Sequence, residues 1–307
     1  MRTILLGPQR FLTTAGAAVH SLSVDGHVAI VTAGWRDRED DDAELDSVLD
    51  GRSRNLGLFG RLTDVLDTDT RFAAAALEHR DAMDDLVAVY SLRLQRTLDS
   101  VYAAQRRTVR ADIADAALAD GVRAVRAVDS WYLDTVDQLY GELELASPVA
   151  ESEPVQRHRA EVAEILESAG VLAIAGGHVG VLLRCLKLFA VLPPVDMPVV
   201  AWSAGAMALT DRVVLYNDNG PEGRQGAELW DRGLGRVHGV VAMPHARRRL
   251  RMDDPMTLRV LVRRFVDASC LLLDDGTRVD MGADGEIPDG ARVLSDYGSV
   301  GTVGGLP

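Results

Sequence analysis

The sequence predicts an α/β protein in which a mostly parallel sheet is flanked by helices. Short apolar strands alternate with helical segments over residues 155–210, and tight turns join them. Two further strands are expected at residues 4–6 and 27–32, the second of them rich in β-branched residues. Because strands that alternate with helices through short turns are typical of parallel sheets, we expect a single α/β domain over residues 1–307.

The composition is that of an ordinary globular protein, and its charge argues against one class of partner. Acidic residues outnumber basic ones by 46 to 33, which gives a formal net charge of −13. Such a surface repels phosphate backbones, so nucleic acid is not an expected partner. The two cysteines, Cys185 and Cys270, are each followed by leucine, which predicts buried small side chains rather than a disulfide or a metal site.

The chain shows no targeting or membrane signal. The apolar run at its N-terminus is too short for a signal peptide, and no stretch approaches the roughly 18 apolar residues of a membrane helix. We therefore expect a cytoplasmic protein that does not bind membranes.

Residues 70–147 interrupt the α/β rhythm as a helical insertion. Apolar residues recur there at helical spacing and Gly and Pro are almost absent, which predicts two long helices. We expect them to form an antiparallel hairpin that turns near residues 105–110. Their apolar face has to be buried, and packing on the rest of the same chain is the preferred interpretation. The alternative is that the helices of residues 70–145 form a lid, or an arm through which a homodimer assembles.

Ser203 follows an apolar strand and precedes a helix that begins with small residues. In a nucleophile elbow the sharp turn forces strained backbone angles on the serine, so the residues two positions away must be small; here they are Ala201 and Gly205. The backbone N–H of Ala204 would then donate to an oxyanion. A serine that merely caps a helix would give the same pattern, so this segment leaves both interpretations open.

A catalytic serine needs a general base, and the base needs an acid to orient it. His245 ends a predicted apolar strand, at the edge where parallel sheets carry functional groups, whereas His238 precedes that strand and should lie at the opposite edge. Spacing alone does not choose the acid. The carboxylates between Ser203 and His245 that we consider are Asp211, Asp218, Glu222, Glu228 and Asp231.

Four segments together resemble the aspartyl dipeptidase and cyanophycinase family of serine peptidases, which has the class I glutamine amidotransferase-like fold. In chain order they are similar to the family's strand ending in Gly-Gly-Asn, its Gly-x-Ser-Ala-Gly-Ala turn, its Asn-Asp stretch and its Gly-Leu-Gly…His block followed by arginines. These segments are residues 173–178, 201–206, 216–219 and 233–251. The similarity covers residues 155–280 and, more weakly, the first 35 residues.

The resemblance implies a Ser-His-Asp triad. Ser203 would be the nucleophile, His245 the general base, and Asp218 the acid that orients the base. Glu222 is the reserve for the acid, because the cyanophycinase branch uses a carboxylate slightly further along the chain.

The resemblance also implies the groups that bind the substrate. Gly177 and Ala204 would supply the two N–H groups of the oxyanion hole, because a glycine turn lets the backbone approach the substrate carbonyl closely. His178, Arg249 and Arg251 would line the substrate site, and the two guanidinium groups suit an acidic substrate. Neither a metal nor an organic cofactor is implied.

The sequence departs from the family pattern at four places. Ala201 replaces a glycine, His178 replaces an asparagine, Ala246 replaces an aromatic residue, and the helical region 70–145 has no counterpart in the short dipeptidases. These departures leave the identity of the substrate open.

The sequence therefore predicts a serine peptidase or amidohydrolase that cleaves a small peptide or isopeptide amide. A catalytically silent, amidotransferase-like binding or scaffold protein is the alternative. An α/β-hydrolase esterase is less favoured, because its histidine normally lies far downstream, whereas Ser203 and His245 are 42 residues apart (245 − 203). A glutamine amidotransferase would need cysteine at position 203 and glutamate where Arg247 stands.

Overall fold

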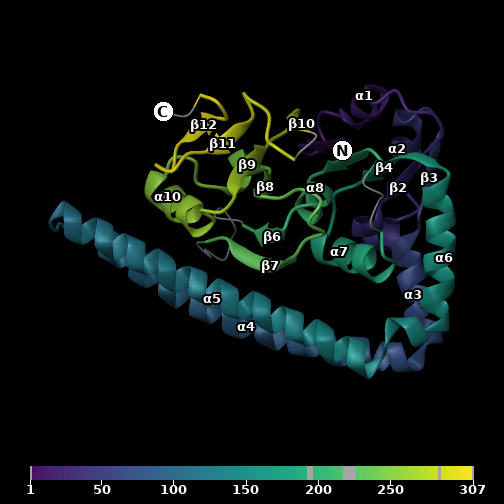
Figure 1. Ribbon diagram of the computed structural model, residues 1–307, viewed down its shortest axis with the longest axis horizontal. Helices are drawn as coiled ribbons and strands as arrows, with labels where there is room; N and C mark the ends of the chain where they lie inside the picture. Colours follow the sequence, from purple (N-terminus) through teal and green to yellow (C-terminus); the bar gives the residue numbers. More distant parts are fainter. Residues whose placement is uncertain (1, 192–195, 217–225, 283–284, 306–307) are drawn as a thin grey trace.

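The structure is a computed structural model that describes residues 2–191, 196–216, 226–282 and 285–305. A six-stranded sheet at its centre has the order β10-β1-β5-β4-β2-β3 and is parallel except for β10 (Figure 1). The predicted α/β class with a mostly parallel sheet is thus confirmed. In that order the strands are Arg278–Met281, Thr3–Leu6, Val199–Trp202, Ala169–Ile174, His27–Val31 and Ser53–Asn55.

Helices cover both faces of this sheet, and alternation along the strands explains how. In β1, Ile4 and Leu6 point into a cluster that includes the side chains of α1, while Leu5 points into a second cluster with the opposite helices. The helices around the sheet are α1 (Ala15–His20), α2 (Ala43–Val48), α3 (Leu58–Thr68), α6 (Glu153–Glu167), α7 (Val179–Leu188) and the 3-10 turns η1 (Ala33–Arg38) and η2 (Val149–Glu151).

A second sheet has the order β12-β11-β9-β8, in which only β8 and β9 are parallel. Its strands are Val300–Thr302, Arg292–Leu294, Ser269–Leu273 and Val240–Pro244. Beside it lie the antiparallel pair β6 (Arg212–Leu215) and β7 (Glu228–Arg232) and the helices α8 (Ala204–Ala208), α9 (Ala246–Arg249) and α10 (Pro255–Arg264).

The helical insertion is a long antiparallel hairpin made of α4 (Thr70–Gln105) and α5 (Ala111–Ala146), each 36 residues long. Asp69 caps α4 by accepting a hydrogen bond from a backbone N–H of its first turn. Figure 1 shows the hairpin running past β7 and α10 of its own chain. Tyr90 and Tyr132 stack between the helices and bond to the backbone of β7. Both the two helices and their packing on the same chain are as predicted.

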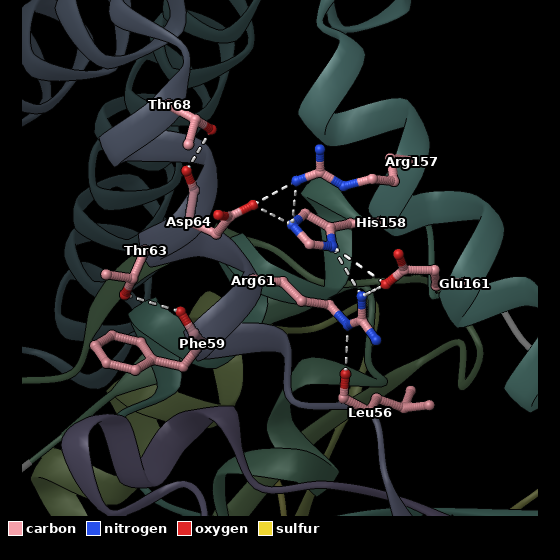
Figure 2. Close-up of polar contacts among 9 residues, drawn as sticks. All are labelled: Leu56, Phe59, Arg61, Thr63, Asp64, Thr68, Arg157, His158 and Glu161. Carbon is pink, nitrogen blue, oxygen red and sulfur yellow. Dashed lines mark hydrogen bonds and ion pairs between the residues drawn. The ribbon is translucent and has the colours of Figure 1, made fainter.

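A polar cluster fastens α3 to α6, the helices that precede and follow the hairpin (Figure 2). His158 lies between Asp64, 2.7 Å from its Nε2, and Arg61, 2.8 Å from its Nδ1. Because a guanidinium can only donate, Nδ1 accepts and Nε2 carries the proton. Arg61 also pairs with Glu161 of α6. This network therefore joins the helix before the hairpin to the helix after it.

The cysteines and the C-terminal segment also bear on the sequence predictions. Cys185 and Cys270 are buried without a disulfide, as predicted, and burial raises the pKa of each thiol to about 12. From the glycine-rich composition of residues 298–307 we expect a frayed end. This is wrong for residues 300–302, which form β12 and pair with β11, because the ladder satisfies their backbone groups.

Candidate active site

Ser203 occupies the turn between β5 and α8 and has an unusual backbone. Its φ of 52° and ψ of −118° lie in a region that residues with a side chain rarely adopt. The residue is partly buried, between the buried side chains of Trp202 and Ala204. A strained serine between a buried strand and a helix is the geometry of a nucleophile elbow.

The residues around Ser203 have to be small because neighbouring atoms approach their backbone closely. A Cβ on Gly176 would lie 2.9 Å from the Cβ of Ser203 and 3.3 Å from its Oγ. A Cβ on Gly205 would lie 2.3 Å from the carbonyl oxygen of Ile174. Ala201, which stands where the family has glycine, is completely buried in the core, so its methyl group is accommodated there.

Gly177 and Ala204 place two backbone N–H groups near Ser203. Gly177 has a φ of 126°, and a Cβ there would lie 2.5 Å from the carbonyl of Gly34. The next N–H, that of His178, donates to the Gly34 oxygen over 2.8 Å and fixes this turn. Across the described residues, the N–H groups of Gly177 and Ala204 donate no hydrogen bond.

His245 directly follows β8, as predicted, and His238 precedes that strand at the other end. His245 has left-handed backbone angles, with φ 59° and ψ 31°, and its N–H donates to the carbonyl of Leu273 over 3.1 Å. Burial, followed by the charge of Arg249, lowers the pKa of His245 below its usual 6.5. The imidazole is therefore neutral at pH 7 and can accept a proton.

Ser203 and His245 lie at the same edge of the protein, where the two sheets meet. The N–H of Ser203 donates to the carbonyl of Leu6, at the end of β1, over 3.3 Å. Gly7 follows and packs so tightly on the carbonyl of Asp274, after β9, that a Cβ would lie 1.8 Å from that oxygen. Strand β9 in turn pairs with β8, which carries His245. Over the described part of the chain, the structure shows no hydrogen bond between the Ser203 hydroxyl and the His245 ring.

The two carboxylates implied for the triad, Asp218 and Glu222, lie outside the described residues. Two of the other candidates, Asp211 and Asp231, have different partners. Asp211 accepts from Nδ1 of His238 over 2.6 Å. Asp231 is buried, where it accepts from the hydroxyl of Tyr140 and pairs with Lys187.

Two carboxylates outside the set of candidates from the sequence act on His245. Asp275 and Asp274 follow β9, the strand beside β8, and their charges favour the protonated form of His245. Asp274 accepts from the backbone N–H of Arg247 over 2.9 Å, and Asp275 pairs with Arg248 over 2.9 Å. The positions of Asp274 and Asp275 near His245 could have been predicted from the sequence, because the carboxyl ends of neighbouring parallel strands meet at one edge of a sheet.

A cavity of about 670 Å³ adjoins this edge. Its lining includes Gly177, His178 and Trp202, residues of the segment after β1, and the loop after β2. His178 caps α7 by accepting from a backbone N–H through Nδ1, so its Nε2 carries the proton. Arg36, which also lines the cavity, has a φ of 57° and a ψ of −124°, close to the strained angles of Ser203. No local pattern in the sequence distinguishes Arg36 from the other arginines.

The two predicted substrate arginines follow β8: Arg249 ends α9, and Arg251 comes two residues later. Arg249 is exposed, and its charge acts on His245. Arg251 is partly buried. Asp254, which follows these arginines in the sequence, accepts from the backbone N–H of Thr257 at the start of α10. His178 and the arginines thus lie at different parts of the candidate site.

None of the helices in the described part of the chain combines the length and the apolar character that a membrane span requires. In comparisons with known proteins, no family model and no curated protein matches this chain.

Proposed function

We propose that this protein is a serine hydrolase that cleaves a small peptide or isopeptide amide, with Ser203 as its nucleophile. The observation that carries the proposal is the backbone of Ser203, φ 52° and ψ −118°, between a buried strand and a helix. Such strain costs about 1–3 kcal/mol and persists where function requires it. A serine that merely capped a helix would need no such angles.

In the proposed reaction, Oγ of Ser203 attacks the amide carbonyl while His245 accepts the hydroxyl proton. The N–H groups of Gly177 and Ala204 hold the negative oxygen of the tetrahedral intermediate. The C–N bond then breaks, and His245 returns the proton to the leaving amine. Water hydrolyses the acyl-serine ester by the same steps, which restores the enzyme.

The lowered pKa of His245 supports its role as the base, because a neutral imidazole is required before the attack. The acid that orients it is proposed to be Asp218, with Glu222 in reserve. Asp274 and Asp275 are the described carboxylates whose charges act on His245. The hydrogen bond between a catalytic serine and its base often forms or shortens only when substrate binds.

We extend the proposal to the fold class. A parallel sheet with the serine after β5 and the histidine after a strand of the adjoining sheet is consistent with the class I glutamine amidotransferase-like fold. The hairpin α4–α5 would then be an addition to that fold, and the dipeptidase and cyanophycinase family the nearest functional analogy.

A fluorophosphonate probe tests the proposal, because it forms a covalent bond only with an activated serine. We expect wild type to be labelled at Ser203, and Ser203→Ala and His245→Ala to remain unlabelled. Ser130→Ala, in an exposed position of α5, is the matched control and should label like wild type. Absence of labelling in folded wild type would instead favour a silent scaffold protein. A library of dipeptides and isopeptides would then define the substrate.

A further inference from the structure

His178 also lines a second cavity, which lies between α7 and the base of the helical hairpin. Its volume is about 540 Å³, within the range of small-molecule sites. The helices α4 and α5 and the strand β7 contribute most of its apolar wall. The apolar side chains that line it include Phe72, Met83, Val87, Leu143, Val181 and Trp230.

Gly180, in the first turn of α7, and the ring of Trp230 pack closely against each other in the wall of this cavity. A Cβ on Gly180 would lie 2.7 Å from Cζ2 of Trp230. Because Gly180 has no side chain, the indole ring can pack directly on the helix that His178 caps. The wall of the cavity is therefore tightly packed at this point.

Most charged groups around the cavity already have partners. Lys187 pairs with Asp231 over 2.9 Å, and Nε of Arg159 donates to a backbone carbonyl over 2.8 Å. Arg80 pairs with its neighbour Asp81. Of the remaining carboxylates, Glu144 accepts from the N–H of Val149, and Asp84 is exposed to solvent.

Arg184 is the exception among these cations. It lies on α7, partly buried, and makes no hydrogen bond or ion pair with any residue that the structure describes. Burial lowers the pKa of its guanidinium, which nevertheless stays charged. A guanidinium with five donors against an apolar wall is matched by a carboxylate, which can accept two parallel bonds.

The position of His178 links this cavity to the candidate catalytic edge. His178 lines both cavities, and Gly177, which precedes it, lines the 670 Å³ cavity beside Trp202. The two cavities therefore share a lining residue that directly follows the N–H group of Gly177 in the chain.

We infer that the cavity between α7 and the hairpin is a recognition site for molecules that carry a carboxylate on an apolar body, with Arg184 binding the carboxylate. The binding site stands on the cavity and on Arg184 alone. Its use as a substrate subsite rests on the proposed hydrolase function of Ser203. The hairpin then serves as one wall of the binding site, and acidic recognition lies at Arg184 rather than at the arginines after β8.

Isothermal titration calorimetry with 4-phenylbutyrate and its uncharged analogue 4-phenylbutyramide tests this inference. We expect wild type to bind the acid at least about tenfold more tightly than the amide, because a charge-assisted hydrogen bond is lost with the amide. Arg184→Gln should abolish that preference, and Arg184→Lys should keep part of it. Arg123→Gln removes the same charge from an exposed pair with Asp120 on α5 and should bind like wild type.

A preference for the acid that survives in Arg184→Gln would overturn the inference, as would wild type that binds neither compound. Val87→Trp fills the cavity from α4 and should weaken the binding of both compounds; unchanged binding would place the site elsewhere. Thermal unfolding of each variant separates lost binding from lost fold. The titrations are repeated in Ser203→Ala, which should bind like wild type. Missing fluorophosphonate labelling together with Arg184-dependent binding would therefore reject only the hydrolase proposal.

Discussion

Asp129 of α5 and Arg264 of α10 form a bidentate ion pair inside the protein, with both N···O distances at 2.6 Å. Arg264 is only 3% exposed. The hydroxyl of Tyr90, from α4, donates to Asp129 over 2.9 Å and accepts from Arg264 over 2.8 Å. This network ties both helices of the hairpin to the C-terminal part of the chain.

Breaking this pair from one side should strongly destabilise the protein. Asp129→Ala leaves the guanidinium of Arg264 buried without its carboxylate, and we expect the free energy of unfolding to fall by about 3–5 kcal/mol. Urea denaturation measures it. The control is Asp134→Ala, which removes an exposed carboxylate 3.7 Å from Arg232 and should cost less than about 1 kcal/mol. Equal losses in the two variants would contradict the role assigned to the buried pair.

The strain at Ser203 predicts an inverted order of stability. Ser203→Gly and Ser203→Ala both remove the hydroxyl, but only glycine adopts a φ of 52° and ψ of −118° without cost. We expect the glycine variant to be more stable than the alanine variant by about 1 kcal/mol, measured by thermal or urea unfolding. At Ser130, within α5, the order should be the ordinary one, with alanine the more stable. An alanine variant that is also the more stable at position 203 would show that the turn is unstrained.

The turn at Gly177 should tolerate no side chain. In Gly177→Ala the new Cβ would lie 2.5 Å from the carbonyl of Gly34 at a φ of 126°, so we expect a loss of roughly 1–3 kcal/mol and weaker fluorophosphonate labelling. Gly141→Ala is the matched control, because Gly141 lies in α5 with open space at its Cβ position. That variant should gain up to about 1 kcal/mol. A neutral effect at both positions would remove the steric basis of the proposed oxyanion turn.

The rate of labelling should depend on pH through His245. The base must be neutral, so labelling falls as pH drops through the pKa of His245, and the midpoint should lie below 6.5. Arg249→Gln removes a cation that lowers this pKa and should move the midpoint up. Asp275→Asn removes an anion that raises it and should move the midpoint down. NMR titration of the His245 ring follows the same shifts without turnover, and shifts of the same sign in both variants would exclude His245 as the titrating group.

The sequence was most informative where a pattern is local. Strand β5 ends directly before Ser203, as predicted, because its apolar side chains are buried on both faces and its run lies between Pro198 and the turn serine. The hairpin was predictable because Gly and Pro are nearly absent over more than seventy residues of helical periodicity. The end of β8 at His245 followed from the same reasoning.

What the sequence could not provide depends on residues far apart in the chain. Asp129 and Arg264 each resemble a solvent-facing charge on an amphipathic helix, and only the docking of α10 on α5 makes them a buried pair. The cavity at Arg184 exists only once α7 and the hairpin face each other. The pairing of β10 with β1, which brings the end of the chain to its first strand, likewise depends on residues far apart in the sequence.

The position of β1 also sets the order in which the protein can be completed during translation. This first strand lies between β10 and β5, so one of its neighbours is made 275 residues later (278 − 3). Arg264 likewise reaches Asp129 across 135 residues of chain. Contacts of such separation slow folding and favour populated intermediates. A nascent chain interrupted before α10 would expose the apolar face of the hairpin together with a carboxylate that lacks its guanidinium, which makes it a target for chaperones.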